Sequence, residues 1–208
     1  MKTLGSSLIL VVLLFPAFAQ QKNPEQQNAQ AQTGGGALIY AEGGAFLLTG
    51  PKGWTLDREV GQRLGTCCVY YPEGSTWDDA ETVMYPSIAS KGPGQVTLEE
   101  FMRNDLDDFR DHNPGMSFED GVEIPLKHGR SAKIRYFYNV NRGSSEAVAY
   151  INEPKIIALV VMNSKTKKGL NENLPFLKAT LATYAFMDVK FANGVDPSQK
   201  QSFKIPQD

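Results

Sequence analysis

Apolar residues fall into short alternating runs separated by turn residues, a pattern typical of β-strands. The alternation is clearest over 131–140, where Ala132, Ile134 and Tyr136 share one face. Residues 156–162 are apolar at every position, which is typical of a strand covered on both sides. Similar runs predict further extended segments at 38–40, 45–49, 54–56, 66–71, 82–89, 122–126 and 146–152.

Helical spacing occurs in two places. Over 97–112, Leu98, Met102 and Leu106 recur at helical steps, and Thr97 followed by Glu100 matches a capping box. The second helical region lies within 165–186, where Pro175 suits only a first turn, so we expect a short helix before Asn173 and a main helix from Leu174. The polar segment 57–65 is expected to be a loop.

The order of these elements predicts one α+β domain over residues 37–190. Hairpins come first, followed by a helix, a meander of strands and a second helix. One strand of the meander is apolar on both faces. This order predicts a central, mostly antiparallel sheet with helices on both faces, an α/β/α sandwich.

The N-terminal residues predict export. Lys2, the apolar run 8–15 and the small residues around Ala19 match a secretory signal peptide cleaved after Ala19. The run is too short to span a bilayer, so we expect a secreted or periplasmic chain with no transmembrane segment. Residues 20–36, rich in Gln and Gly, are expected to be a flexible leader or a short assembly segment, and 191–208 a loose tail.

Composition excludes some classes of function. The formal net charge of −2 lacks the basic excess of a general nucleic-acid binder, so no nucleic-acid partner is expected. Two cysteines in 208 residues do not make a disulfide scaffold, and a chain of this length can bury an ordinary core.

Two segments carry a family resemblance. Residues 46–54 read FLLTGPKGW, an apolar strand followed by Pro-x-Gly-Trp, and residues 129–132 read GRSA at the start of a long strand. Together with the helix at mid-chain, they resemble PsbP/Mog-type proteins. The resemblance implies an α/β/α sandwich over most of 37–190. It also implies a protein that binds other proteins or assemblies, because members of this fold mostly do so.

The hairpin over 64–90 is the expected place of partner contact. Trp77 lies among Ser75, Thr76 and Asp78, so its ring is expected at the surface. Aromatic anchors beside a polar rim are typical of protein interfaces. The candidate partner-binding residues are Trp77, Tyr71, Asp78 and Trp54. In the alternative interpretation, Trp54 and Tyr85 are core residues and Trp77 only covers them.

Cys67 and Cys68 form a possible thiol site. On a strand their side chains would point to opposite faces, which favours one buried thiol and one outward thiol. A vicinal disulfide would be strained, because adjacent Cα atoms lie only about 3.8 Å apart. An exposed thiol would also be able to link two chains. A thiol-dependent hydrolase would need His112 or His128 as a base, but neither lies in a known hydrolase signature.

The remaining chemistry is sparse. Glu73, Asp78, Asp79 and Glu81 make an acidic tip without the spacing of an EF-hand, so neither a metal nor another cofactor is expected. The leading prediction is a non-catalytic interaction module with an unidentified protein partner. The alternatives are a binding module for a small apolar or envelope-derived ligand, held between sheet and helix, and the thiol-dependent hydrolase.

Overall fold

The computed structural model describes residues 32–92, 94 and 96–188. The predicted signal peptide (1–19), most of the predicted leader and the predicted tail (191–208) lie outside these residues. Strand β1 (Gln32–Thr33) and the start of β2 (Gly36–Ala41) fall within the range predicted as leader.

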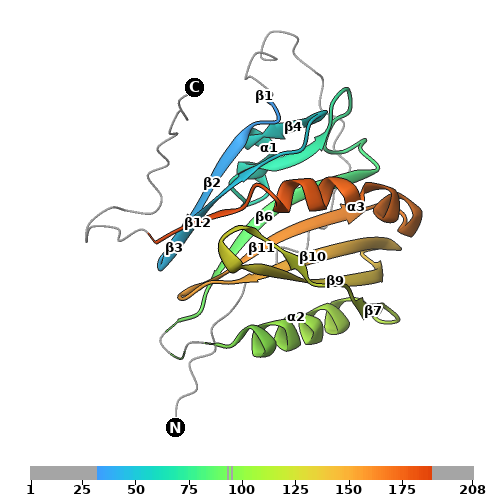
Figure 1. The fold of residues 1–208 in the computed structure, drawn as a ribbon. Helices are drawn as coiled ribbons and strands as arrows, with labels where there is room; N and C mark the ends of the chain where they lie inside the picture. Colours follow the sequence, from blue (N-terminus) through green and yellow to red (C-terminus); the bar gives the residue numbers. More distant parts are fainter. Residues whose placement is uncertain (1–31, 93, 95, 189–208) are drawn as a thin grey trace.

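A nine-stranded antiparallel sheet forms the centre of the molecule (Figure 1). Its strands run in the order β1-β4-β5-β6-β11-β10-β9-β7, and β8 also pairs with β9. The bounds are β4 (Trp54–Asp57), β5 (Val69–Pro72), β6 (Thr82–Ser90), β7 (Ser117–Asp120), β8 (Ile124–Pro125), β9 (Ser131–Val140), β10 (Ser144–Asn152) and β11 (Ile156–Ser164). The doubly apolar run is β11, which lies between β6 and β10 as its pattern predicted.

A second, three-stranded sheet runs in the order β12 (Ala185–Met187), β3 (Gly44–Thr49) and β2. Its strands are also antiparallel. Gly43 adopts a φ of 104° in the turn between β2 and β3, a conformation that favours glycine. The antiparallel α+β class predicted from the sequence is thus confirmed.

Helix α2 (Leu98–His112) begins where the capping box predicted. The Thr97 side chain accepts a hydrogen bond from the Glu100 backbone N–H, and the Glu100 carboxylate accepts one from the Thr97 backbone. The prediction of a loop at 57–65 was wrong, because α1 (Arg58–Arg63) forms there. Asp57 caps α1 by accepting from the Val60 N–H at 2.9 Å, and the helix buries Val60 and Gly61.

Helix α3 (Lys167–Leu181) is continuous through Pro175, so the predicted break before Leu174 was wrong. Proline leaves the carbonyl four residues earlier, that of Asn171, without its helical donor. Both Pro175 and Asn171 are exposed, so water can satisfy that carbonyl. None of the described helices combines the length and apolar character that crossing a bilayer would require.

The side chains of β10 alternate between two hydrophobic clusters. Ala147, Ala149 and Ile151 belong to the cluster that contains Leu170, Leu177 and Leu181 of α3. Val148 and Tyr150 belong to the cluster that contains Leu98, Met102, Leu106 and Phe109 of α2. In Figure 1 the strands β9 to β11 are drawn between the two helices.

Candidate functional site

Two of the predicted contact residues are buried. Trp54 is 2% exposed and its ring lies 5.5 Å from that of Phe176. Tyr71 is 8% exposed and donates its hydroxyl hydrogen to Asp57 at 2.8 Å. Burial and the neighbouring carboxylate raise the pKa of Tyr71 to about 12. Neither side chain offers surface to a partner, so the predicted contact set is reduced to Trp77 and Asp78.

The tip around Trp77 is held by its neighbours. Trp77 is half-buried, with its ring edge-on to Tyr85 at 6.5 Å, while Asp78 is exposed. The Lys165 ammonium donates to the backbone oxygens of Asp78 and Asp79 at 3.1 and 2.9 Å. The Asp78 carboxylate remains exposed beside a half-buried ring.

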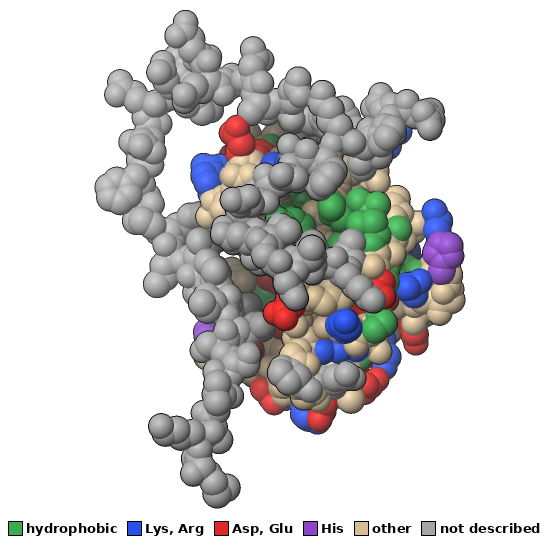
Figure 2. Space-filling view, turned by 90° about the vertical axis from the view of Figure 1, so that its left-hand side faces the viewer, with side chains coloured by type: hydrophobic (Ala, Val, Ile, Leu, Met, Phe, Trp, Pro, Cys, Tyr) green, Lys and Arg blue, Asp and Glu red, His purple; other side chains and the backbone are tan. Residues whose placement is uncertain are grey.

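The outer face of the three-stranded sheet is a second candidate contact surface, which was not predicted from the sequence. One cross-strand row is Leu38, Leu47 and Ala185, and the next is Tyr40, Ala45 and Met187. All six side chains are apolar or aromatic, and all except Ala45 keep some exposure. Figure 2 shows hydrophobic side chains gathered on the side where β3 and β12 are labelled in Figure 1.

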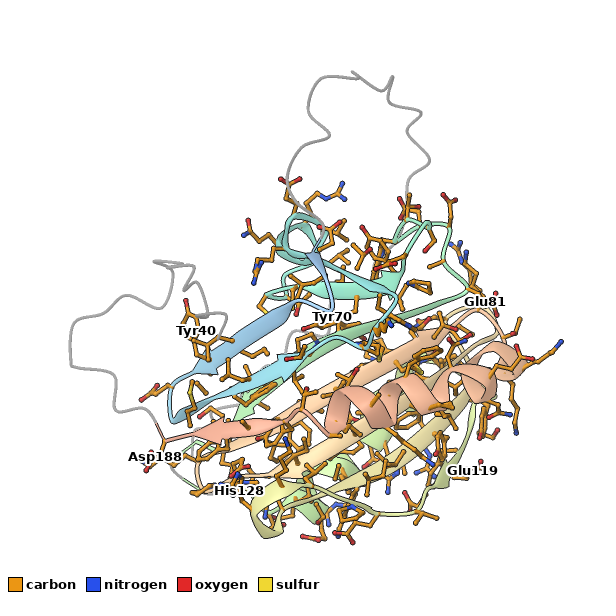
Figure 3. All side chains as sticks on the ribbon, turned by 45° about the horizontal axis from the view of Figure 1, so that its top comes forward. Tyr40, Tyr70, Glu81, Glu119, His128 and Asp188 are labelled. Carbon is orange, nitrogen blue, oxygen red and sulfur yellow. The ribbon has the colours of Figure 1, made fainter. Side chains whose placement is uncertain are left out.

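The opposite face of this small sheet belongs to the core, through Ala37, Ile39, Phe46 and Leu48. In Figure 3, Tyr40 points away from the body of the sheet. An antiparallel sheet with one solvated face normally alternates apolar and polar residues. Successive apolar residues in Leu38-Ile39-Tyr40 and Phe46-Leu47-Leu48 were the sequence signal for two apolar faces.

The cysteine pair lies in a bend before β5, not on a strand as predicted. The prediction failed because β5 begins only at Val69. The two Sγ atoms are 3.2 Å apart and no disulfide joins them. Cys68 is fully buried and Cys67 is half-buried, which matches the favoured division between an inner and an outer thiol.

The environment of Cys68 does not activate it as a nucleophile. Its hydrogen bond with Cys67 and its burial raise the pKa of Cys68 strongly, so it stays a neutral thiol near pH 7. The groups that act on its titration are Cys67, Tyr70 and Arg58. In the described part of the chain no histidine is among these groups, and His112 Nδ1 instead lies 2.7 Å from the Asp108 carbonyl oxygen. His128 is exposed in a turn, and Figure 3 places it well away from Tyr70.

A cavity of about 390 Å³ lies between α2 and the β7–β9 edge of the sheet. Its lining carries charges of both signs. Lys133 forms a salt bridge with Glu99 at 2.8 Å, and Arg135 forms one with Asp120 at 2.7 Å. This lining is a poor match for the small apolar ligand that the alternative interpretation places between sheet and helix. The acidic tip forms no cluster of three metal-ligating side chains within the described residues.

A carboxylate is buried near helix α2. Glu146 is 5% exposed and accepts hydrogen bonds from the Asn163 and Asn141 amides at 2.8 and 3.4 Å. Burial raises the pKa of Glu146 to about 7, and nearby Asp105 adds to the increase. Burial also raises the pKa of Asp105, although a hydrogen bond from Tyr150 opposes this.

No family model and no curated protein match the chain. Among solved structures, it is similar to cyanobacterial PsbP from Synechocystis sp. PCC 6803. That match has 11% identity and a TM-score of 0.45, and covers 79% of this chain and 100% of the other. It is also similar to the Ran-binding protein Mog1p from Saccharomyces cerevisiae, with 13% identity, a TM-score of 0.45, and 74% and 96% coverage.

A protein of unknown function from Pseudomonas aeruginosa matches at 12% identity and a TM-score of 0.38, with 76% of this chain and 85% of the other covered. PsbP and Mog1 are thus among the structural neighbours, as the sequence resemblance predicted. At this level of similarity the neighbours carry no argument about binding or catalysis in this chain.

Proposed function

We propose that the chain is a non-catalytic, secreted or periplasmic interaction module whose contact surface is the outer face of the small sheet. The observation that carries this proposal is that both faces of the sheet are apolar. The inner face is accounted for by the core. The outer rows contain Leu38, Leu47, Tyr40 and Met187, which are all partly exposed, and a contiguous apolar surface of this kind is typical of a protein-binding surface. Export rests on the signal sequence ending at Ala19.

The frame that we propose for this surface is the α/β/α sandwich, with α2 and α3 on opposite faces of the large sheet. The alternation of β10 side chains between the two helix clusters supports it, because successive side chains of a strand point to opposite faces. Such a frame would hold the contact surface rigid and limit the entropy lost on binding.

The non-catalytic part of the proposal is supported by the state of the candidate chemical groups. A nucleophilic cysteine needs a lowered pKa and a neighbouring base. In this protein the pKa of Cys68 is raised, and His112 contacts a carbonyl oxygen of its own helix. Cys68 therefore has neither the lowered pKa nor the neighbouring base.

The Trp77–Asp78 tip is a second candidate surface. It combines the partly exposed Trp77 ring with the outward Asp78 carboxylate. Lys165 holds the backbone of the tip through hydrogen bonds to the carbonyl oxygens of Asp78 and Asp79. A partner of this tip would carry a basic group beside an apolar one.

Photo-crosslinking from single positions distinguishes these surfaces. A benzophenone amino acid in place of Tyr40 reports on the outer sheet face, and one in place of Trp77 reports on the tip. Phe176 on α3, whose side chain is 37% exposed, is the position of the aromatic control. The full chain is expressed in an exporting host and irradiated in cells. We expect a discrete adduct from Tyr40 and none from Phe176.

Leu47→Asp provides the matched test of specificity. A carboxylate in the outer row should abolish the Tyr40 adduct, whereas Thr49→Asp, at an exposed position of the same strand, should leave it. Thermal melting checks that both variants remain folded. Adducts from Trp77 alone would move the contact surface to the tip. Equal adducts from all three positions, or from none, would refute a specific contact surface.

A further inference from the structure

We propose that Cys67 and Cys68 form a redox modification site that cycles between a dithiol and a vicinal disulfide by exchange with a small disulfide. The inference does not depend on the contact function. It rests on the geometry of the pair, on the different exposure of the two thiols and on the packing around Cys68.

The backbone brings the two sulfurs together. Because the pair lies in a bend and not on a strand, both side chains can turn to the same side, and the Sγ atoms are 3.2 Å apart. Adjacent Cα atoms lie about 3.8 Å apart, which is below the usual disulfide range of roughly 4.4–6.8 Å. A bond between them would therefore be strained, and strained disulfides are labile and reversible.

The two thiols have different roles. Cys67 is half-buried and can meet a disulfide from solvent, whereas Cys68 is fully buried. The hydrogen bond with Cys67 and burial raise the pKa of Cys68, which keeps the inner thiol protonated. Cys67 is thus the attacking group and Cys68 the resolving group.

The exchange balances with a disulfide of the glutathione class as oxidant. The Cys67 thiolate attacks one sulfur of the disulfide, which forms a mixed disulfide and releases one thiolate. Cys68 then gives its proton to water and its sulfur attacks Cys67, which releases the second thiolate. The protein dithiol loses two electrons, and the small disulfide is reduced to two thiols.

The packing around Cys68 would transmit the change. A Cβ atom on Gly61 would lie 2.4 Å from the Cys68 Cα, so α1 and the Cys68 backbone are in direct contact. Val60, next to Gly61 on α1, shares a hydrophobic cluster with Trp77. The Tyr70 hydroxyl is also buried, and burial, followed by the neighbouring Cys68, raises the pKa of Tyr70. Closing the ring moves a sulfur beside this buried hydroxyl and against a helix.

The test incubates the full-length protein with oxidised glutathione, quenches it with acid, alkylates it with iodoacetamide in denaturant and measures the intact mass. The reduced protein should take two alkyl groups. The oxidised protein should take none, carry no glutathione and be two mass units lighter, and dithiothreitol should restore both alkylations. Tryptophan emission should change on oxidation, and Trp77→Phe should remove most of that change.

Single variants separate the two roles. Cys68→Ser should retain one glutathione on Cys67, because the resolving thiol is gone, whereas Cys67→Ser should gain an adduct at least tenfold more slowly. A wild-type chain that keeps both thiols, stops at a stable mixed disulfide or forms a disulfide-linked dimer would overturn the proposal. The wild-type result decides the question even if neither variant folds.

Discussion

The two hydrophobic clusters between which the β10 side chains alternate are built differently. We call the cluster that contains α3 residues the α3 side and the cluster that contains α2 residues the α2 side. The α3 side contains small side chains such as Ala147, Ala149 and Ala158, and the buried carboxylate beside it, Glu153, is paired with Arg130 at 2.6 Å. The α2 side adds buried polar groups to its apolar cluster, namely Glu146, Arg135 and the hydroxyl of Tyr150.

This difference predicts that the two sides contribute differently to the free energy of unfolding and to its dependence on pH. Apolar packing is insensitive to pH, whereas a buried carboxyl without a paired cation makes the folded state depend on its protonation. We expect the α3 side to carry the larger share of packing energy and the α2 side to carry the pH response.

The largest expected effect compares matched leucines on the two helices. Leu177 of α3 is 1% exposed and Leu106 of α2 is 8% exposed. Leu177→Ala should lower the free energy of unfolding by about 4 kcal/mol and Leu106→Ala by about 2 kcal/mol, because the cost of a cavity grows as the surroundings become less able to relax. Urea denaturation of both variants measures the two losses. Equal losses would mean that the faces do not differ in packing.

The second effect is the pH dependence of Glu146. Its ordinary pKa near 4.5 rises to about 7 in the folded protein, so between these values the folded state holds a proton that the unfolded chain has lost. The stabilisation is complete below pH 4.5 and is lost as the pH rises through 7, by roughly 3 kcal/mol from this group. The raised pKa of Asp105 adds a loss of the same sign.

Urea unfolding between pH 4.5 and 8 tests this response. Glu146→Gln keeps an oxygen for the Asn163 amide and removes the titration, so it should flatten most of the slope. Asp105→Asn should flatten a smaller part. An unchanged slope in Glu146→Gln would place the titration elsewhere and remove the electrostatic contrast between the two faces.

Much of the fold could be predicted because local sequence and tertiary packing agree. The capping box and apolar spacing located α2, and the uninterrupted apolar run identified β11 as a central strand. The failures occurred where tertiary context overrides local preference. A six-residue α1 is too short for periodicity to reveal, and Pro175 lies on the exposed side of α3, where its missing hydrogen bond is tolerated.

The candidate site could be predicted less well. The polar neighbours of Trp77 indicated its partial exposure, but no local signal decided whether Trp54 and Tyr71 are buried, as they are in the structure. The pairing of β12 with β3 joins residues 185–187 to 45–47, so the outer apolar face depends on a contact between distant parts of the chain. The buried Glu146 likewise depends on Asn163 of a neighbouring strand.

The third effect compares the two helix caps. Thr97 accepts from the Glu100 N–H at 3.2 Å and donates to the Glu100 carboxylate at 2.9 Å, so both of its bonds lie within α2. Thr166 accepts from the Gly169 N–H at 2.9 Å and donates to Glu81, outside its own helix, at 2.6 Å. Thr97→Ala should cost about 1 kcal/mol, and Thr166→Ala about 2 kcal/mol because the lost bond to Glu81 also ties α3 to the segment before β6. The matched Thr→Ser variants keep the hydroxyl and should lose little. A smaller loss at Thr166 would contradict the stronger anchoring of α3.

The smallest effect concerns the exposed ion pair between Lys133 and Glu99 beside α2. Its side chains are 40% and 69% exposed, so water and salt screen the attraction, and Lys133→Gln should leave urea unfolding unchanged within error. Arg135 on the same strand is the control. Its side chain is 11% exposed, binds Asp120 and donates to the Met102 carbonyl at 2.7 Å, so Arg135→Gln should be clearly destabilising. If both variants were silent, the polar groups of the α2 side would contribute to pH response alone and not to the attachment of the helix.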